Sequence, residues 1–230
     1  EGLGRVGYRE ARADESADLC IVNTCTVTAT GDAKSRQVIR RLARENPGTR
    51  IVVMGCYATR AATEIASLPN VTEVVTDKRE LPDLLGRFGV VDVPTGISGF
   101  GSRQRAYVKV QDGCDNRCTF CVVTIARGPG RSLRKDEILT EIRGLVALGY
   151  REVVLSGVHL GSYGHDLGQT RGLEHLVRAI LAETDLPRLR LSSLEPWDLD
   201  PEFFRIFDDA RVLPHLHLPL QSGCDATLAR

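Results

Sequence analysis

The chain has 230 residues, of which 42% are hydrophobic and 26% are charged, proportions that are ordinary for a globular protein. Thirty basic residues balance thirty acidic ones, so the net charge indicates neither nucleic acid nor a membrane surface as a partner, and a polyanion site has to arise from local clustering. No apolar run is long enough for a transmembrane helix.

The seven cysteines are an odd number that does not fit a framework of disulfides. Clustered thiols are better explained as metal ligands in a reducing cytoplasm, where we expect the protein to act. Both ends of the chain fall inside patterns typical of helices, so we also expect a fragment of a longer protein, truncated at both ends.

Short apolar runs alternate with helical patterns in the first part of the chain, which predicts a parallel sheet covered by helices. Ligands of such sheets bind at the carboxyl ends of the strands, and Cys25 and Cys56 each stand at such an end. The strands are expected at residues 17–25, 50–56 and 71–76, and the helices at residues 31–46 and 62–70.

The run DVPTGISGFGSRQR (Asp92–Arg105) is rich in Gly, Ser and Pro and has no periodicity, which predicts an interdomain linker. We therefore divide the chain into an N-terminal domain at residues 1–93, a linker at 94–105 and a second domain at 106–230.

Four more apolar runs alternate with helical patterns after the linker, which predicts consecutive right-handed βα units. Three of these runs alternate apolar and polar residues, as where Val108 and Val110 share one face and Tyr107 and Lys109 the other. A polar face fits the lumen of a partial TIM-like barrel with a polar ligand, and a sheet with one solvent-exposed side is the alternative. The strands are expected at residues 106–113, 151–159, 188–196 and 215–223, and the helices from near Ser132, Gly172 and Asp200. The predicted fold class is thus α/β, with an N-terminal parallel-sheet domain and a partial barrel.

The stretch DGCDNRCTFC places Cys114, Cys118 and Cys121 at C-x3-C-x2-C spacing, just after the first of these strands. Tetrahedral zinc would need a fourth protein ligand nearby, and no His or Cys follows until His159. A four-iron cluster held by three thiolates instead leaves one iron open to a small chelating molecule. Gly113 permits the tight turn that would aim the three sulfurs at one point.

The sequence GCDNRCTFC after a strand resembles the signature of the radical S-adenosylmethionine (SAM) enzymes. The resemblance implies a [4Fe-4S] cluster on these three cysteines, with the amino and carboxylate groups of SAM on the open iron, and cleavage of SAM to methionine and a 5′-deoxyadenosyl radical. Further motifs look like those of the methylthiotransferases. Two of them, SGVHLGSYG and LSSLEP, look most like the branch acting on N6-threonylcarbamoyladenosine at position 37 of tRNA. The others are VNTCTVT, VMGCYA, IARGPGRS and HLPLQSG.

The resemblance also implies an auxiliary [4Fe-4S] cluster in the N-terminal domain. Cys25 and Cys56 match two of its three ligands, and the third lies, in the family, upstream of the first residue here. Cys20 is not expected to replace it, because the alternation of an extended strand points its side chain away from Cys25. We expect Cys20 to be a buried structural thiol and Cys224 to be inert.

The loop RGPGRSLRK gathers basic residues ahead of a predicted helix, and such a patch supplies salt-dependent contacts to an RNA backbone. Solvated side chains near a helix start are the alternative. Arg36, Arg40 and Arg44, at i,i+4 spacing on the early helix, are better explained as a solvated helix face. We assign RNA binding to Arg127, Arg131, Arg134 and Lys135.

Several residues stand at or just beyond the carboxyl ends of the predicted barrel strands, where barrels keep their ligands. Gly157 would let a ligand approach the backbone closely. Trp197 is expected to cover the barrel rim or to pack in the core, with stacking on a tRNA base as the alternative. As a group the candidates for holding SAM are Gly157, His159, Ser193, Glu195 and Gln221, although each alone could be a satisfied polar group. No catalytic residue is assigned beyond the cluster ligands.

The resemblance implies transfer of a methylthio group to C2 of N6-threonylcarbamoyladenosine in tRNA, with SAM as both methyl donor and radical source. The implied partners are tRNA and an electron donor such as flavodoxin or ferredoxin, with no membrane, while the sulfur donor is open. Alternatives with the same chemistry act on isopentenyladenosine-37 tRNA or on a ribosomal-protein aspartate. An iron–sulfur electron carrier and a zinc-binding RNA module are the non-catalytic alternatives.

Overall fold

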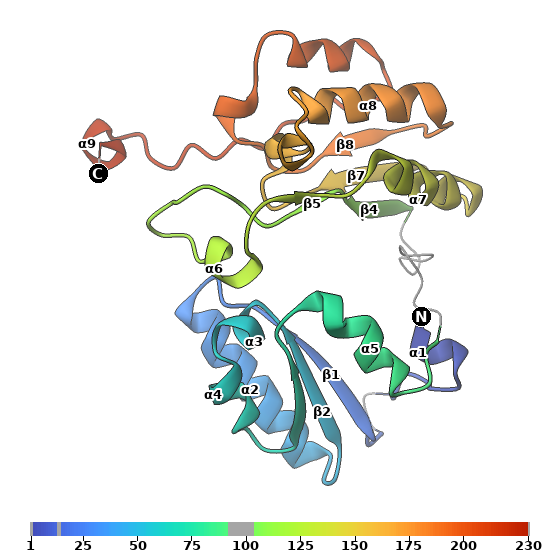
Figure 1. Cartoon of the computed structure of the whole chain (residues 1–230), viewed down its shortest axis with the longest axis vertical. Helices are drawn as coiled ribbons and strands as arrows, with labels where there is room; N and C mark the ends of the chain where they lie inside the picture. Colours follow the sequence, from blue (N-terminus) through green and yellow to red (C-terminus); the bar gives the residue numbers. More distant parts are fainter. Residues whose placement is uncertain (1, 13–14, 92–103, 230) are drawn as a thin grey trace. The chain divides into compact units, whose positions relative to one another are not determined.

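The computed structural model describes residues 2–12, 15–91 and 104–229 (Figure 1). The chain divides into two compact units. The first comprises Glu1–Pro94 and Asn116–Gly128, and the second comprises Thr95–Asp115 and Pro129–Arg230. Of the predicted linker at 94–105, only Gln104 and Arg105 lie among the described residues.

The first unit is built on a parallel sheet with the strand order β1-β2-β3. These strands are β1 (Leu19–Thr24), β2 (Arg50–Gly55) and β3 (Val71–Val75). The helices of this unit are α1 (Gly2–Arg5), α2 (Ala29–Glu45), α3 (Cys56–Arg60), α4 (Ala62–Ala66), the 3-10 turn η1 (Lys78–Glu80), α5 (Leu81–Gly86) and α6 (Val123–Arg127).

Helices cover both faces of this sheet (Figure 1). On one face Ile39 of α2 and Ile65 of α4 pack with Ile51 and Val53 of β2. On the other face Leu84 of α5 packs with Val52. The continuous apolar run of β2 follows from this position, since the central strand of a covered parallel sheet has no solvent-facing side.

Helix α2 begins where the sequence provides a cap for it. The side chain of Thr28 accepts a hydrogen bond from the backbone N–H of Gly31 at 3.0 Å, and this satisfies one of the free donors of the first turn. The helix ends at Glu45, with Asn46 as its C-cap, ahead of Pro47 and Gly48. The cap residue Thr28 lies three residues after Cys25 and therefore fixes the start of α2 at Ala29.

The second unit contains a parallel sheet with the order β4-β7-β8 and a separate antiparallel pair, β5 with β6. The strands are β4 (Arg105–Lys109), β5 (Gln111–Asp112), β6 (Arg131–Ser132), β7 (Glu152–Ser156) and β8 (Leu189–Leu191). The helices are α7 (Lys135–Ala147), α8 (Gly172–Glu183) and α9 (Asp225–Leu228), and the 3-10 turns are η2 (Leu160–Ser162), η3 (His165–Leu167), η4 (Pro196–Asp198) and η5 (Phe203–Asp208).

One face of the second sheet carries the core of this unit. Val108 of β4 and Leu189 of β8 are fully buried and belong to the same cluster as Ile142 of α7 and Val177 of α8. The opposite face of β4 is open, with Tyr107 44% exposed. The predicted α/β class with parallel sheets and a partial TIM-like barrel is confirmed.

Two local predictions for this unit are wrong. Residues 215–223 form no strand and make only an isolated bridge, Ser193 with His217. Pro219 has no N–H to donate to a ladder, and Leu220, on the supposed apolar face, is 78% exposed. The helix expected near Asp200 is the 3-10 turn η5.

Among residues 2–12, 15–91 and 104–229, no helix combines the length and apolar character needed to cross a membrane.

Candidate functional site

Cys25 and Cys56 lie at the carboxyl edge of the first sheet. Thr24, the last residue of β1, is in register with Gly55, the last residue of β2, and each cysteine is the next residue in its chain segment. Paired strands are about 5 Å apart, so the two cysteine backbones leave the sheet side by side. Cys25 is exposed, Cys56 is half-buried, and neither is in a disulfide.

Gly55 makes the turn between β2 and the second of these cysteines possible. Its φ is +100°, a region that disfavours every residue with a side chain. A Cβ at this position would also lie 2.3 Å from the carbonyl oxygen of Thr24 and 2.5 Å from Oδ1 of Asn23. A glycine is therefore required for β1 and β2 to end this close together.

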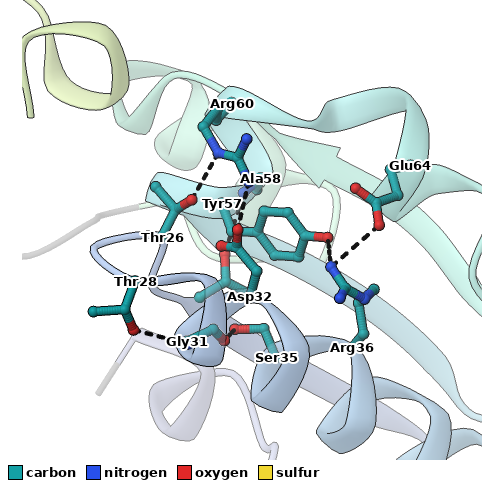
Figure 2. A network of polar contacts seen from close by, with 11 residues as sticks. Thr26, Thr28, Gly31, Asp32, Ser35, Arg36, Tyr57, Ala58, Arg60 and Glu64 are labelled. Carbon is teal, nitrogen blue, oxygen red and sulfur yellow. Dashed lines mark hydrogen bonds and ion pairs between the residues drawn. The ribbon is translucent and has the colours of Figure 1, made fainter. Parts of the chain in front are cut away.

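A network of polar contacts joins the loop after Cys25 to helix α3, which begins at Cys56 (Figure 2). Arg60 donates through Nε to Oγ1 of Thr26 at 2.7 Å and through its guanidinium to Oδ2 of Asp32. The backbone N–H of Ala58 donates to Oγ1 of Thr24 at 3.2 Å. Because these bonds cross from one cysteine-bearing segment to the other, they fix the two segments relative to each other.

Tyr57, the residue after Cys56, is fully buried, and two guanidinium groups lie near its ring. The guanidinium carbons of Arg36 and Arg60 lie 5.7 Å and 5.5 Å from the ring centroid, within cation–π range. Arg36 also donates to the Tyr57 hydroxyl and forms an ion pair with Glu64 at 3.2 Å (Figure 2). Burial is the main cause that raises the pKa of Tyr57 above its ordinary value.

Cys20 lies within β1 and points into the core, as the strand alternation predicts. It is half-buried and packs against the core of the first unit, and its sulfur accepts a hydrogen bond from the Thr49 hydroxyl at 3.6 Å. Its neighbour Ile21, on the opposite face, is 40% exposed. The side chain of Cys20 therefore belongs to the core rather than to the carboxyl edge.

The cysteine triplet follows β5. Gly113 has φ of +74°, which gives the turn that the sequence predicted, and Nε2 of Gln111 holds it by donating to the Gly113 carbonyl at 2.8 Å. Cys114 is half-buried and belongs to the second unit, whereas Cys118 and Cys121 are exposed and belong to the segment grouped with the first unit. None of the three is in a disulfide. Three reduced thiols within eight residues are a donor set that suits iron–sulfur ligation.

His159 is the best-defined polar side chain of the second unit. It is 6% exposed, and its Nε2–H donates to Oδ2 of Asp198 at 2.7 Å. Its Nδ1 lies 3.8 Å from the sulfur of Cys114, and its backbone N–H donates to Oε1 of Gln111 at 2.9 Å. The hydrogen bond to Asp198 is the main cause that raises the pKa of His159.

Glu195 lies beside this pair, with Oε2 3.5 Å from Nε2 of His159. Burial raises the pKa of the Glu195 carboxyl. Its Oε2 and the hydroxyl of Ser192 are both buried and lack a hydrogen-bond partner within the described residues. Buried polar atoms without a partner are costly unless a ligand satisfies them, so these two atoms are available to hydrogen-bond a polar ligand. His159, Glu195 and Asp198 also present atoms close enough together to share a cation.

The other predicted SAM contacts are Gly157, Ser193 and Gln221. Gly157 lies against Gln111, whose Cβ and Oε1 would both be 3.1 Å from a Cβ on that glycine, so the close approach there is made by a protein side chain. Ser193 is exposed and shares a 2.6 Å hydrogen bond with Nδ1 of His217. Gln221 is exposed and has φ of +63°. Trp197 is 66% exposed with its ring 6.4 Å from that of His159, so the core alternative for Trp197 is wrong.

The predicted RNA-binding residues fall in both units. Arg127 is half-buried in α6 of the first unit. In the second unit Arg131 is exposed in β6, and Arg134 and Lys135 are exposed at the start of α7. Lys135 forms an ion pair with Glu183 at 3.5 Å, and at this exposure such a pair is weak enough for a phosphate to replace.

Several residues of these sites carry no signal in the sequence. Asp198 follows Glu195 by three residues in LEPWD, and only this spacing to a predicted site residue could have indicated it. Gln111 looked like one residue of an alternating strand, although it holds both Gly113 and His159. Asp32 and Arg60 are 28 residues apart, and no local pattern pairs them.

Two protein-family models match segments of this chain. The chain belongs to the radical SAM superfamily, whose model matches residues 108–230, more than half of the chain. A model described as Uncharacterized protein family UPF0004 matches residues 1–77. The superfamily implies SAM and an iron–sulfur cluster as cofactors.

Within this superfamily the chain is similar to the threonylcarbamoyladenosine tRNA methylthiotransferases named MtaB. It is 36% identical to the protein of Bacillus subtilis (strain 168), over 97% of this chain and 54% of the relative. It is 35% identical to that of Thermotoga maritima, over 100% of this chain and 56% of the relative. The tRNA-2-methylthio-N(6)-dimethylallyladenosine synthase of Sorangium cellulosum (strain So ce56) is 35% identical over 97% of this chain and 53% of its own length. The chain thus spans about half the length of the curated relatives it matches.

A solved structure gives the same fold. The radical S-adenosylmethionine methyltransferase TsrM from Kitasatospora setae, solved with tryptophan and a SAM analogue, superposes with a TM-score of 0.59 at 16% identity. The match covers 94% of this chain and 51% of TsrM. At this identity the likeness supports the fold alone.

Proposed function

We propose that the protein is a radical SAM methylthiotransferase that modifies C2 of N6-threonylcarbamoyladenosine at position 37 of tRNA. The observation that carries the proposal is the combination of two sites in one chain. Cys25 and Cys56 stand at adjacent strand ends in the part that matches UPF0004, and the triplet from Cys114 to Cys121 lies in the part that matches the radical SAM superfamily. Relatives named for this activity match nearly the whole chain.

In this proposal Cys114, Cys118 and Cys121 hold the [4Fe-4S] cluster to which SAM binds, and Cys25 and Cys56 are two ligands of an auxiliary [4Fe-4S] cluster. Held by these residues and reduced, the first cluster would supply the one-electron reduction of SAM on which hydrogen abstraction from the adenine C2 depends. No amino-acid side chain can perform that abstraction, so the task of this chain is to position the reactants and exclude water.

The buried group around His159 performs part of that positioning. Asp198 fixes the orientation of the imidazole through Nε2–H, so Nδ1 faces Cys114. The buried Oε2 of Glu195, which accepts no hydrogen bond within the described residues, is available to an amino or hydroxyl group of SAM. Gly157, Ser193 and Gln221 complete the proposed set of SAM contacts.

The remaining parts of the proposal concern organisation and partners. The N-terminal methylthiotransferase domain comprises residues 1–93, and the radical SAM domain begins at residue 106. We propose tRNA as the substrate, with Arg127, Arg131, Arg134 and Lys135 on its backbone, flavodoxin or ferredoxin as the electron donor, and the cytoplasm as the location.

A second candidate substrate is isopentenyladenosine-37 of tRNA, because a relative named for dimethylallyladenosine is 35% identical over 97% of the chain. The test is to incubate the reconstituted, reduced protein and SAM with tRNA carrying either modified adenosine, and to analyse the digested nucleosides by mass spectrometry. A methylthio product from the threonylcarbamoyl substrate alone is expected. A product from the isopentenyl substrate alone would reassign the protein, and no product from either, in the presence of 5′-deoxyadenosine formation, would exclude both.

A further inference from the structure

The solvent side of α2 carries a dense set of positive charges. Helix α2 spans Ala29–Glu45, and five of its residues are basic and share a continuous part of its surface. We call this set the basic face of α2, and it consists of Lys34, Arg36, Arg40, Arg41 and Arg44. The whole chain is neutral, with 30 basic and 30 acidic residues, so this concentration is local rather than a general property of the protein.

The basic face has few carboxylates to neutralise it. Arg36 pairs with Glu64 at 3.2 Å, and Arg41 pairs with Glu45 at 3.9 Å. Within the described residues no carboxylate lies within 4.0 Å of the charged groups of Lys34, Arg40 or Arg44. The remaining acid of the helix, Asp32, is buried and bound to Arg60. Three unpaired cations on one surface repel each other, and this cost is offset when an anion binds.

The side chains of the basic face border an open groove. It lines a groove of about 590 Å³, together with Ala33, Gln37 and Val38. Arg36, Arg40 and Arg44 recur every four residues, which places successive guanidinium groups about 6 Å apart along the helix axis. A row of cations at such short intervals suits an extended polyanion better than one small anion.

We propose that the basic face of α2 is a docking surface for the phosphate backbone of RNA. The proposal rests on the tRNA substrate proposed above and adds a second surface to it, on an element that the sequence indicated to be merely solvated. The groove is lined by no aromatic side chain among the described residues, so it offers no aromatic platform for stacking bases, and its closely spaced cations suit phosphates. It therefore positions the RNA without reading its sequence.

The direction of α2 connects this surface to the site. The helix starts at Ala29, close after Cys25, and its charged residues follow from Lys34 to Arg44, a distance of about 15 Å along the axis. Arg36 belongs both to the basic face and to the network around Tyr57, which follows Cys56 (Figure 2). An RNA strand lying on the basic face thus leads toward the edge of the sheet where the two cysteines stand.

The test measures RNA binding by the full chain without cluster or SAM. The probe is an unmodified tRNA transcript, and the variant is Lys34→Gln/Arg40→Gln/Arg44→Gln, which removes three charges and keeps good helix formers on α2. The matched control is Arg79→Gln/Arg87→Gln/Arg143→Gln, which removes three charges from arginines paired with Asp77, Glu73 and Glu183. Both variants have the same net charge, so a general electrostatic effect would appear equally in both.

We expect the α2 variant to bind the transcript at least about tenfold more weakly at low salt, with a slope of log Kobs against log[salt] that is smaller by about 2, because each phosphate contact contributes roughly 0.7 to it. The control should change neither value appreciably. Equal losses in both variants, or an unchanged slope in the α2 variant, would overturn the inference. Displacement of the transcript by polyglutamate as effectively as by RNA of equal charge would assign the surface to an acidic protein instead.

This experiment separates the inference from the proposed enzymatic function. Binding needs neither iron nor SAM. If the α2 variant loses affinity for the transcript and the unsubstituted chain forms no methylthio nucleoside, the docking surface is supported and the proposed activity is wrong. If the unsubstituted chain modifies tRNA and the α2 variant binds the transcript normally, the proposed activity is supported and the docking surface is wrong.

Discussion

The Nε2 atom of His159 lies 2.7 Å from Oδ2 of Asp198, and Gly161 leaves the space for this contact, since a Cβ on Gly161 would be 2.3 Å from the same oxygen. The imidazole is 6% exposed and so has little access to water as a substitute partner. A buried ring held in this way has one orientation, with Nδ1 toward Cys114. The pairing therefore positions a polar group beside the first cysteine of the triplet.

We predict that Asp198→Ala lowers the free energy of unfolding by about 1–3 kcal/mol, because it removes the acceptor at 2.7 Å from the Nε2–H of a buried imidazole and leaves only Oε2 of Glu195, 3.5 Å away. Asp198→Asn keeps an oxygen that can accept this bond and should lose less. Urea unfolding followed by the fluorescence of Trp197, the single tryptophan, measures both values. Equal losses for the alanine and asparagine variants would argue against this hydrogen bond.

We predict that Gly55→Ala is far more damaging than an alanine at another positive-φ glycine. Gly48→Ala is the matched control, because Gly48 has φ of +84° and open space around the position of a Cβ. Gly48→Ala should cost about 1 kcal/mol of backbone strain, whereas Gly55→Ala adds the collision with Thr24 and should cost roughly 3 kcal/mol or more. Urea unfolding followed by circular dichroism compares them, and similar midpoints would contradict the close approach of β1 and β2.

The contrast between these sites shows what the sequence could predict. The three strands of the first unit and both cysteine positions at the strand ends were predicted, because apolar runs and turn residues are local signals. The strand at 215–223 was wrong because alternation of Leu and His indicates only a strand-like pattern, and a strand also needs a neighbour with which to pair. Gln111 and Asp198 could not be assigned, since their roles come from partners that the fold brings together.

We predict that Arg60→Ala destabilises the first unit, because it removes the partner of the Asp32 carboxylate, whose other oxygen already lacks a hydrogen bond within the described residues. The side chain of Asp32 is 12% exposed but that of Arg60 is 39% exposed, so we expect a loss of about 1–2 kcal/mol, below the range for a fully buried pair. Arg79→Ala, which removes an exposed pair with Asp77, should cost less than about 1 kcal/mol. Thermal unfolding distinguishes the two, and an Arg60 variant as stable as the Arg79 variant would contradict the network of Figure 2.

We predict that stability falls at alkaline pH through Tyr163. Burial raises the pKa of Tyr163 to about 12, and its hydroxyl donates to the carbonyl of Leu133 at 2.9 Å. Because the folded state holds this proton more tightly than the unfolded state does, the contribution is fully present below pH 10 and is lost as pH rises from about 10 to 12. It amounts to roughly 2–3 kcal/mol.

Tyr163→Phe should lack this alkaline loss, at the cost of one hydrogen bond at neutral pH. Tyr107→Phe is the control, because Tyr107 is 44% exposed. Urea unfolding of both variants and the unsubstituted chain at pH 8 and pH 11 provides the comparison. If the Tyr163→Phe and Tyr107→Phe variants lost stability in parallel, the assignment to Tyr163 would be wrong.

The most direct test of the account is the formation of 5′-deoxyadenosine. The reconstituted protein, incubated anaerobically with SAM and dithionite, should produce it, and Cys118→Ala should abolish it. Cys224→Ala, which removes another exposed thiol, should leave it unchanged. An iron-loaded protein that forms no 5′-deoxyadenosine, or a Cys118→Ala variant that forms as much as the unsubstituted chain, would contradict the assignment of this triplet to a SAM-cleaving cluster.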